Sequence, residues 1–288
     1  MNEDKLLDGK KLANKLNSDM EEEVSELISK NGVVPTLATV LVGDDPASEV
    51  YIRIKHRVCE KIGINSISVK LDETISKEDL TIQIEKLNKD STIHGILLQL
   101  PLPKSLQQYE DELIQRINPL KDVDGFNYIN RGKLFDYNEE LAPCTPKGII
   151  KLLEHYNVEI QGKDITIINR SNLVGKPLMF MFLKRNGTIS VCHTSTRDID
   201  RYIKQADILV VAVGRPKFIT EERIKKGVII IDVGTNRVDG NLCGDVDFEG
   251  VLEKVSKITP SPGGVGPMTV SSLMRNTIIA YKRQLKIK

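Results

Sequence analysis

The sequence lacks the features that direct a chain to a membrane or a nucleic acid. No apolar run reaches the roughly 18 to 20 residues of a membrane-spanning helix, and residues 1–11 lack the apolar core of a signal peptide. Lysine and arginine outnumber aspartate and glutamate by only one, 41 against 40, so no clustered basic excess marks a nucleic-acid-binding surface. We therefore expect a cytoplasmic protein without nucleic-acid or membrane partners.

The sequence also lacks the residue spacings of a metal or disulfide framework. The four cysteines form no Cys-x-x-Cys pair, and the four histidines form no His-Glu-x-x-His pattern. The segment 122–125 resembles the start of a calcium loop, but Lys133 stands where such a loop needs its closing glutamate. We predict no metal site.

The first half of the chain alternates helices with strands. Apolar residues recur at three- and four-residue spacing in the first helix, and the turn 43–46 ends an apolar strand and starts the next helix. We predict strands at 36–42, 64–70 and 95–99, and helices at 6–30, 46–61, 77–88 and 106–116. Such alternation is typical of βαβ units and a mostly parallel sheet.

The second half repeats this α/β pattern after a proline- and glycine-containing segment, 117–146, which we interpret as a linker that carries functional loops. Several of its strands are apolar on both faces, as a parallel sheet covered by helices requires. We predict strands at 164–168, 188–192, 207–213, 228–233 and 257–259, a helix from 147 to 162 and a final helix at 270–283. The length of 288 residues suits two α/β domains.

The usual dinucleotide fingerprint, Gly-x-Gly-x-x-Gly, is missing after the strand 164–168. The strand ends in Asn169, Arg170 and Ser171, and only Gly175 remains near the helix start. A helix N-terminus there can still receive an anionic group. The alternative is a loop that only caps the helix.

Hydroxyl groups and a cation stand where an NAD site usually carries an acid. The strand 188–192 leads into a segment that contains Thr194, and Arg170 follows the neighbouring strand. This combination suits a ribose 2′-phosphate and favours NADP over NAD, unless the segment is only a solvated strand end. Gly214 and Thr235 also follow strands, where an open α/β sheet binds its ligand, although Thr235 can equally start a turn.

Tyr51 and Lys55 are four residues apart in the predicted helix 46–61 and therefore project from one face. On its own, this pair is more often an aromatic ring packed over an aliphatic stem than a functional site. Short-chain dehydrogenases also carry Tyr-x-x-x-Lys, but after their nucleotide-binding strands. Here the pair precedes those strands, so that resemblance fails.

The segment 262–269 contains three glycines and two prolines. Such a composition predicts a rigid loop whose backbone approaches a bulky ligand closely. The alternative is a tight turn before the final helix.

Several segments, taken in chain order, resemble the signatures of the bifunctional methylenetetrahydrofolate dehydrogenase/cyclohydrolases. These are 47–55, 94–103, 121–126, 143–146, 232–234, 244–246 and 262–269. The resemblance covers nearly the whole chain and implies a homodimer. It also implies an N-terminal α/β catalytic domain of residues 1–143 plus 268–288, to which the C-terminal helix returns, and a Rossmann-like NADP-binding domain of residues 144–267.

The resemblance implies oxidation of 5,10-methylenetetrahydrofolate by NADP and hydrolysis of the methenyl product to 10-formyltetrahydrofolate. This is a reaction pair of one-carbon metabolism, which supplies purine, histidine and methionine biosynthesis. Two alternatives stay open: a dehydrogenase with weak or absent cyclohydrolase activity, and a catalytically silent regulator that binds nucleotide or folate.

The resemblance also assigns four catalytic residues. A partly neutral Lys55 would accept a proton from water, because a protonated lysine would be repelled by the methenyl cation. Gln99 would orient Lys55, Tyr51 would stack on the aminobenzoate ring, and Asp124 would accept hydrogen bonds from the pterin amino group. Without the family context, Gln99 would be a satisfied strand-end amide and Asp124 a turn cap.

The predicted contacts form two sets. The substrate set is Ser48, Tyr51, Lys55, Leu98, Gln99, Leu100, Asp124, Pro262, Gly263 and Gly264. The cofactor set is Asn169, Arg170, Ser171, Gly175, Thr194, Gly214, Thr235 and Gly266. The chain departs from the family at Asn169, where glycine is common, and at Thr235, where isoleucine is usual.

Overall fold

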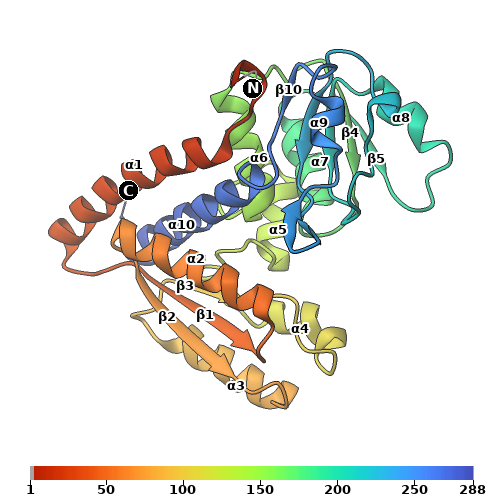
Figure 1. Ribbon diagram of the computed structural model, residues 1–288. Helices are drawn as coiled ribbons and strands as arrows, with labels where there is room; N and C mark the ends of the chain where they lie inside the picture. Colours follow the sequence, from red (N-terminus) through yellow and green to blue (C-terminus); the bar gives the residue numbers. More distant parts are fainter. Residues whose placement is uncertain (1–2, 288) are drawn as a thin grey trace. The chain divides into compact units, whose positions relative to one another are not determined.

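The computed structural model describes residues 3–287, which divide into two compact α/β units (Figure 1). The three-stranded unit comprises Lys15–Cys144 and the chain from Val270 onward. The five-stranded unit comprises Thr145–Thr269 and the chain up to Asn14. The predicted class, two α/β domains with parallel sheets, is confirmed.

The sheet of the three-stranded unit is entirely parallel, with the order β2–β1–β3. Its strands are β1 (Thr36–Val42), β2 (Asn65–Leu71) and β3 (Gly95–Leu98). All seven residues of the central strand β1 are buried, which explains its unbroken apolar sequence, because a central parallel strand is covered on both faces.

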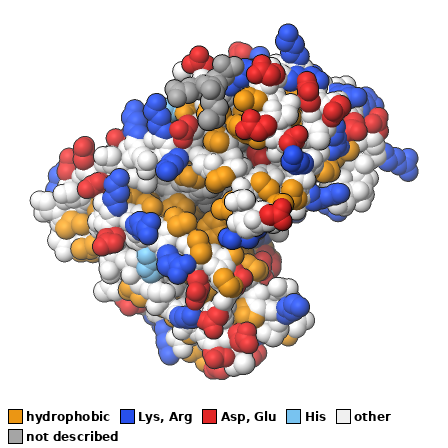
Figure 2. Space-filling view, viewed as in Figure 1, with side chains coloured by type: hydrophobic (Ala, Val, Ile, Leu, Met, Phe, Trp, Pro, Cys, Tyr) orange, Lys and Arg blue, Asp and Glu red, His pale blue; other side chains and the backbone are white. Residues whose placement is uncertain are grey.

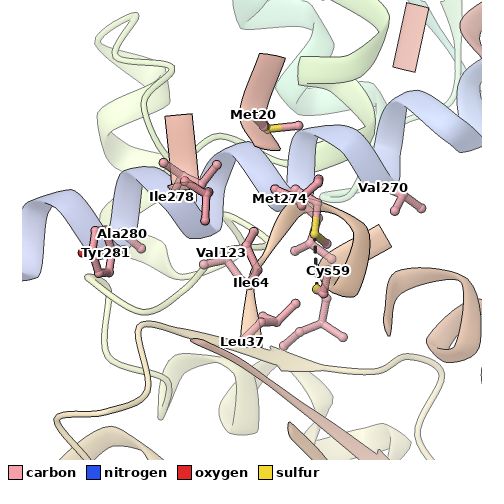
Figure 3. Close-up of a cluster of buried hydrophobic side chains, with 14 of the residues drawn as sticks. Met20, Leu37, Cys59, Ile64, Val123, Val270, Met274, Ile278, Ala280 and Tyr281 are labelled. Atoms are coloured by element: carbon pink, nitrogen blue, oxygen red, sulfur yellow. Dashed lines mark hydrogen bonds between the residues drawn. The ribbon is translucent and has the colours of Figure 1, made fainter. Parts of the chain in front are cut away.

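One face of this sheet packs against three helices. These are α1 (Gly9–Asn31), α2 (Pro46–Ile62) and α10 (Val265–Gln284). Leu37 of β1 and Leu97 of β3 share a buried cluster with residues of all three helices, and in it Cys59 donates a weak hydrogen bond to Met274, with 3.3 Å between the sulfur atoms (Figure 3). The predicted return of the C-terminal helix to the first domain is thereby confirmed.

The opposite face packs against two further helices, α3 (Lys77–Lys89) and α4 (Glu110–Gln115), which follows the 3₁₀ turn η2 (Gln107–Tyr109). Val40 of β1 and Ile96 of β3 point toward this layer, one residue out of phase with Leu37 and Leu97. The alternation follows from the two-residue period of a strand.

Both ends of α2 are fixed by capping residues. The Asp45 carboxylate accepts a hydrogen bond from the amide of Ser48 at 2.7 Å, and Pro46 occupies the first turn. At the other end, Gly63 adopts a left-handed conformation with φ 84° and donates to the carbonyls of the last turn. These caps fix where α2 starts and stops, and α2 carries Tyr51 and Lys55.

The five-stranded unit has an entirely parallel sheet with the order β10–β7–β6–β4–β5. Its strands are β4 (Asp164–Ile168), β5 (Thr188–Cys192), β6 (Ile208–Val211), β7 (Ile229–Asp232) and β10 (Lys257–Ile258). The strand order reverses at β4, and ligands of such sheets bind outside the carboxyl ends near that point. The connecting helices include α7 (Gly175–Lys184), α8 (Ile199–Gln205) and α9 (Phe248–Val251).

Several helical predictions were wrong in extent. The expected linker contains α5 (Tyr128–Phe135), which the Asn127 side chain caps by accepting from the amide of Ile129. The helix expected to reach residue 162 is α6 (Cys144–His155). The final helix begins at Val265 rather than 270, because a proline is tolerated in the first turn of a helix and Pro267 lies there.

A β-hairpin was missed by the sequence analysis. It joins β8 (Asn236–Val238) to β9 (Asn241–Cys243) through Asp239 and Gly240, both with positive φ. An Asp-Gly pair between short strands is a strong hairpin signal. The short strands and their polar sequence hid it from a search for apolar runs.

The face drawn in Figure 2 shows no dominance of one charge. Acidic and basic side chains are interspersed on it, in agreement with the formal net charge of +1. Among residues 3–287, no helix combines the length and apolar character needed to cross a membrane.

The two isoleucines of α3 provide a test of the packing. Ile84 is fully buried, whereas Ile82 is 51% exposed. We expect Ile84→Ala to lower the free energy of unfolding by about 2–5 kcal/mol, because it leaves a cavity, and Ile82→Ala to lower it by less than about 1 kcal/mol. Urea unfolding followed by far-ultraviolet circular dichroism measures both, and equal effects would contradict the assigned packing.

Candidate active site

Lys55 and Gln99 meet in the three-stranded unit. The Lys55 Nζ donates a hydrogen bond to Gln99 Oε1 at 2.8 Å. Gln99 directly follows β3, and its own amide bonds the Val40 carbonyl of β1 at 2.9 Å. Its Nε2 donates to the Leu100 carbonyl at 2.6 Å, which leaves Oε1 to face the lysine. The predicted partnership of these two residues is present.

Tyr51 lies one helical turn before Lys55 on α2 and is 40% exposed. An exposed aromatic ring beside the half-buried Lys55 is free to stack on a flat ligand. Ser48 and Leu98, by contrast, are buried, and Leu98 belongs to the apolar cluster that contacts α3 and α4. A substrate contact at either of these two residues stays a prediction.

Asp124 lies in a loop that a second carboxylate holds in place. Asp122 is buried, and it accepts hydrogen bonds from the amides of Gly125 at 3.1 Å, Phe126 at 3.2 Å and Asn127 at 2.8 Å. The sequence analysis missed this role of Asp122. The Asp-x-Asp-Gly pattern was a usable signal, because aspartate side chains commonly bond backbone amides a few residues further on.

The pKa values of Lys55 and Asp124 are shifted in opposite directions, and both shifts favour the neutral form. Burial lowers the pKa of Lys55 from its ordinary 10.5, and the negative charge of Asp124 offsets part of that effect. Burial raises the pKa of Asp124 to about 6, while the positive charge of Lys55 opposes the rise. More of Lys55 is therefore a neutral amine at a given pH than for an ordinary lysine.

The loop Pro262–Gly264 lies in the five-stranded unit. Gly263 has φ 110°, and its carbonyl accepts from the Lys10 amide at 2.8 Å. A Cβ on Gly9 would lie 1.8 Å from the Gly264 carbonyl oxygen. These glycines therefore permit close packing against the start of α1, and their predicted contact with substrate stays a prediction.

The Asn169 side chain closes the turn before α7. Its Oδ1 accepts from the amides of Ser171 at 2.8 Å and Gly175 at 3.0 Å and from the Ser171 hydroxyl, and its Nδ2 donates to the Ala212 carbonyl at 2.7 Å. A Cβ on Gly175 would lie 2.1 Å from the Asn169 carbonyl oxygen. Asn169 thus acts as an internal cap and already accepts the hydrogen bond of the Gly175 amide at the start of α7, and the predicted cofactor contact at Gly175 stays a prediction.

Arg170 and Thr194 follow neighbouring strands at the same sheet edge. Ile168 of β4 pairs in parallel with Cys192 of β5, two residues before Arg170 and Thr194 respectively. Both side chains are exposed. A guanidinium and a hydroxyl at one edge fit a ribose 2′-phosphate.

The other predicted cofactor residues are open to solvent. Gly214, Thr235 and Gly266 are exposed, and a Cβ on Gly214 or Gly266 would meet nothing within 4 Å. A pocket of about 460 Å³ lies beyond the ends of β6, β7 and β10, with Pro216, Asp232, Gly244 and Ser261 in its lining. None of the predicted cofactor residues lines this pocket, so it is not assigned to the cofactor.

The part of the chain that the structure describes contains no cluster of side chains that could bind a metal ion. No group of three or more His, Cys, Asp and Glu side chains is arranged there to hold an ion. No disulfide bond joins cysteines among residues 3–287.

Comparison with known proteins matches the chain to two family models. The model of the tetrahydrofolate dehydrogenase/cyclohydrolase catalytic domain matches residues 7–124, and that of the NAD(P)-binding domain matches residues 143–285. The protein named bifunctional protein FolD of Halalkalibacterium halodurans is 50% identical over 277 residues, which are 96% of this chain and 98% of that protein. The protein of the same name from Methanosarcina barkeri is 50% identical over 276 residues, which are 96% of each chain.

Solved structures match over a similar extent. The bifunctional enzyme FolD, a methylenetetrahydrofolate dehydrogenase/cyclohydrolase, from Campylobacter jejuni has a TM-score of 0.93 and 46% identity and covers 96% of this chain and 99% of its own. The methylenetetrahydrofolate dehydrogenase-cyclohydrolase of Trypanosoma brucei, solved with an NADP cofactor and an inhibitor, has a TM-score of 0.93 and 33% identity and covers 98% of each chain.

The lowered pKa of Lys55 can be measured directly. We expect the Lys55 Nζ to titrate below 10.5 in a ¹⁵N nuclear magnetic resonance titration. Asp124→Asn should lower the midpoint further, because it removes the negative charge that favours the ammonium form. Asp72→Asn is the control, because the Asp72 carboxylate accepts its hydrogen bonds from Thr74 and not from Lys55, and this variant should leave the Lys55 midpoint unchanged. A Lys55 midpoint at or above 10.5 would refute the assigned electrostatics.

Proposed function

Because the chain belongs to the tetrahydrofolate dehydrogenase/cyclohydrolase family, we propose that it oxidises 5,10-methylenetetrahydrofolate with NADP and hydrolyses the resulting 5,10-methenyltetrahydrofolate to 10-formyltetrahydrofolate. The observation that carries this proposal is the hydrogen bond between Lys55 and Gln99 at 2.8 Å. The raised pKa of Asp124, whose charge interacts with that of Lys55, accompanies it.

NADP, when bound, accepts the hydride that leaves the methylene carbon of the substrate. Arg170 and Thr194, at the shared edge of β4 and β5, would hold its 2′-phosphate, and Gly214 and Thr235 would contact the rest of the cofactor. The crystal structure of the trypanosomal relative with NADP supports this choice of cofactor. The exposure of Arg170 leaves its guanidinium available.

Lys55 carries the hydrolysis as a general base. The methenyl carbon lies between two nitrogens and shares their positive charge, so a neutral amine is tolerated beside it where an ammonium group is repelled. Lys55 takes a proton from the water whose oxygen bonds to that carbon. It returns that proton to N5 as the C–N5 bond breaks. The hydroxyl group of the adduct releases its remaining proton to solvent as the formyl C=O forms, and the formyl group stays on N10.

Gln99 and Asp124 prepare Lys55 and the substrate for this step. The Oε1 of Gln99 holds the amine in one orientation, because Nε2 of the same side chain is bonded to the Leu100 carbonyl. The Asp124 carboxylate would accept hydrogen bonds from the pterin amino group. The exposed ring of Tyr51 would stack on the aminobenzoate ring.

A dehydrogenase without useful cyclohydrolase activity is the alternative of the same class. The proximity of Lys55 and Gln99 and the lowered pKa of Lys55 favour the bifunctional reading, because a dehydrogenase needs no neutral lysine. A catalytically silent regulator would not need Lys55 and Gln99 to be hydrogen-bonded to each other.

The family relationship supports further proposals about the setting of the reaction. We propose a cytoplasmic homodimer that acts in one-carbon metabolism and supplies purine, histidine and methionine biosynthesis. We also propose that residues 1–143 with 268–288 form the folate domain, and that residues 144–267 form the NADP domain. Pro262, Gly263 and Gly264 are proposed to contact folate, and Gly266 the cofactor.

Replacing Lys55 separates the two activities. We expect Lys55→Met to lower the hydrolysis of methenyltetrahydrofolate by at least about 100-fold, the lower range of a lost general base, while folate binding is largely retained. Stopped-flow loss of methenyl absorbance and equilibrium binding of folate measure the two effects. Lys61→Met, an exposed substitution on the same helix, is the matched control. Full hydrolysis by Lys55→Met would refute the role of this residue.

A further inference from the structure

Two carboxylates are buried where β7 ends in the five-stranded unit. Asp232, the last residue of β7, is 4% exposed, and Asp245, shortly after the hairpin β8–β9, is fully buried. Among residues 3–287, neither carboxylate forms an ion pair with a basic side chain. A buried carboxylate without a cation must be held by N–H donors.

The Asp245 carboxylate accepts hydrogen bonds from three consecutive backbone amides. Its Oδ2 accepts from Val213 at 2.6 Å and Gly214 at 3.1 Å, and its Oδ1 accepts from Arg215 at 2.8 Å. The Asn236 side-chain amide donates to the same Oδ1 at 2.9 Å. Hydrogen bonds to an ionised acceptor are stronger than neutral ones, so this carboxylate fixes the path of the chain directly after β6.

Asp232 holds Asp245 in place. Its Oδ1 accepts from the amides of Gly234 at 3.0 Å and Asp245 at 2.9 Å, and its Oδ2 accepts from that of Val246 at 3.0 Å. A Cβ on Gly234 would lie 2.3 Å from the Asp245 carboxyl carbon, and one on Gly244 would lie 1.8 Å from Asp232 Oδ2. Only glycine fits at these two positions, so the backbone itself closes around the two carboxylates.

We propose that Asp245 is a positioning residue for the cofactor, because its carboxylate accepts hydrogen bonds from the backbone amides of the Val213–Arg215 loop and so fixes the conformation of that loop. The inference rests on the proposed contact of the cofactor with Gly214, whose φ of 64° and open surroundings leave the backbone accessible on its other side. Asp245 is fully buried and its oxygens are bonded, so it acts through the loop and does not touch the reacting atoms.

The substitution Asp245→Asn tests this role. An amide offers one acceptor oxygen, so whichever way it lies, two of the four donors face an NH₂ group. We expect the dissociation constant for NADP, measured by titration calorimetry of the full chain, to rise at least about tenfold. Hydrolysis of preformed methenyltetrahydrofolate by the same variant should stay within about twofold of the rate of the unsubstituted protein, because Lys55 and Gln99 belong to the three-stranded unit.

The matched control is Asp247→Asn, two residues further on, where the carboxylate pairs with the exposed Lys217 at 3.1 Å. This control should leave NADP binding unchanged. Unchanged NADP affinity in Asp245→Asn would overturn the inference. If Arg170→Ala weakens NADP in that case, the proposed cofactor site survives alone, and if neither variant weakens NADP, the proposed cofactor site fails as well.

If Asp245→Asn does not fold and loses both activities, the substitution Asn236→Ala tests whether Asp245 positions the loop for NADP binding. This substitution removes one donor to Asp245 and one bond to the Gly244 carbonyl, at a half-buried position that leaves the backbone amides in place. A weaker NADP affinity with full cyclohydrolase activity supports the role of Asp245. An unchanged NADP affinity overturns it.

Discussion

The hydrogen bond between the Lys55 amine and Gln99 is the contact on which the rest of the site depends. It joins a helix to the residue that follows a strand, so both must be placed by the fold before the bond can form. Asp45 and Gly63 cap the two ends of α2, and the Gln99 amide is tied to β1 through the Val40 carbonyl. Burial at this junction lowers the pKa of Lys55 and makes its neutral form accessible.

Buried carboxylates shape the functional loops in both units by the same physical means. Asp122 binds three successive amides beyond Asp124, and Asp245 binds three successive amides around Gly214. In each case the loop carries a predicted ligand contact, Asp124 in one and Gly214 in the other. Oriented backbone amides satisfy the hydrogen-bonding capacity of a buried carboxylate without a cation.

Much of the fold could be predicted from the sequence, because local signals specify it. Apolar runs locate β1, β4 and β5, and the Gly43–Pro46 turn with Gly63 locates α2. The pairing of Lys55 with Gln99 came from the family resemblance rather than from spacing. What could not be predicted depends on contacts between distant segments: Asp245 bonds residues thirty or so positions away, and Asn169 reaches Ala212 across the sheet. The helix α5 escaped detection because it is short and contains a glycine.

The most direct test of the account is the pH dependence of methenyltetrahydrofolate hydrolysis by the unsubstituted protein at saturating substrate, with the uncatalysed rate subtracted. Lys55 is the proposed neutral base and its pKa lies below 10.5, so the proposed active form increases as the pH rises. The account predicts a catalysed rate that climbs with pH through a midpoint below that value. A rate that stays constant or falls with rising pH would show that Lys55 does not act as the base.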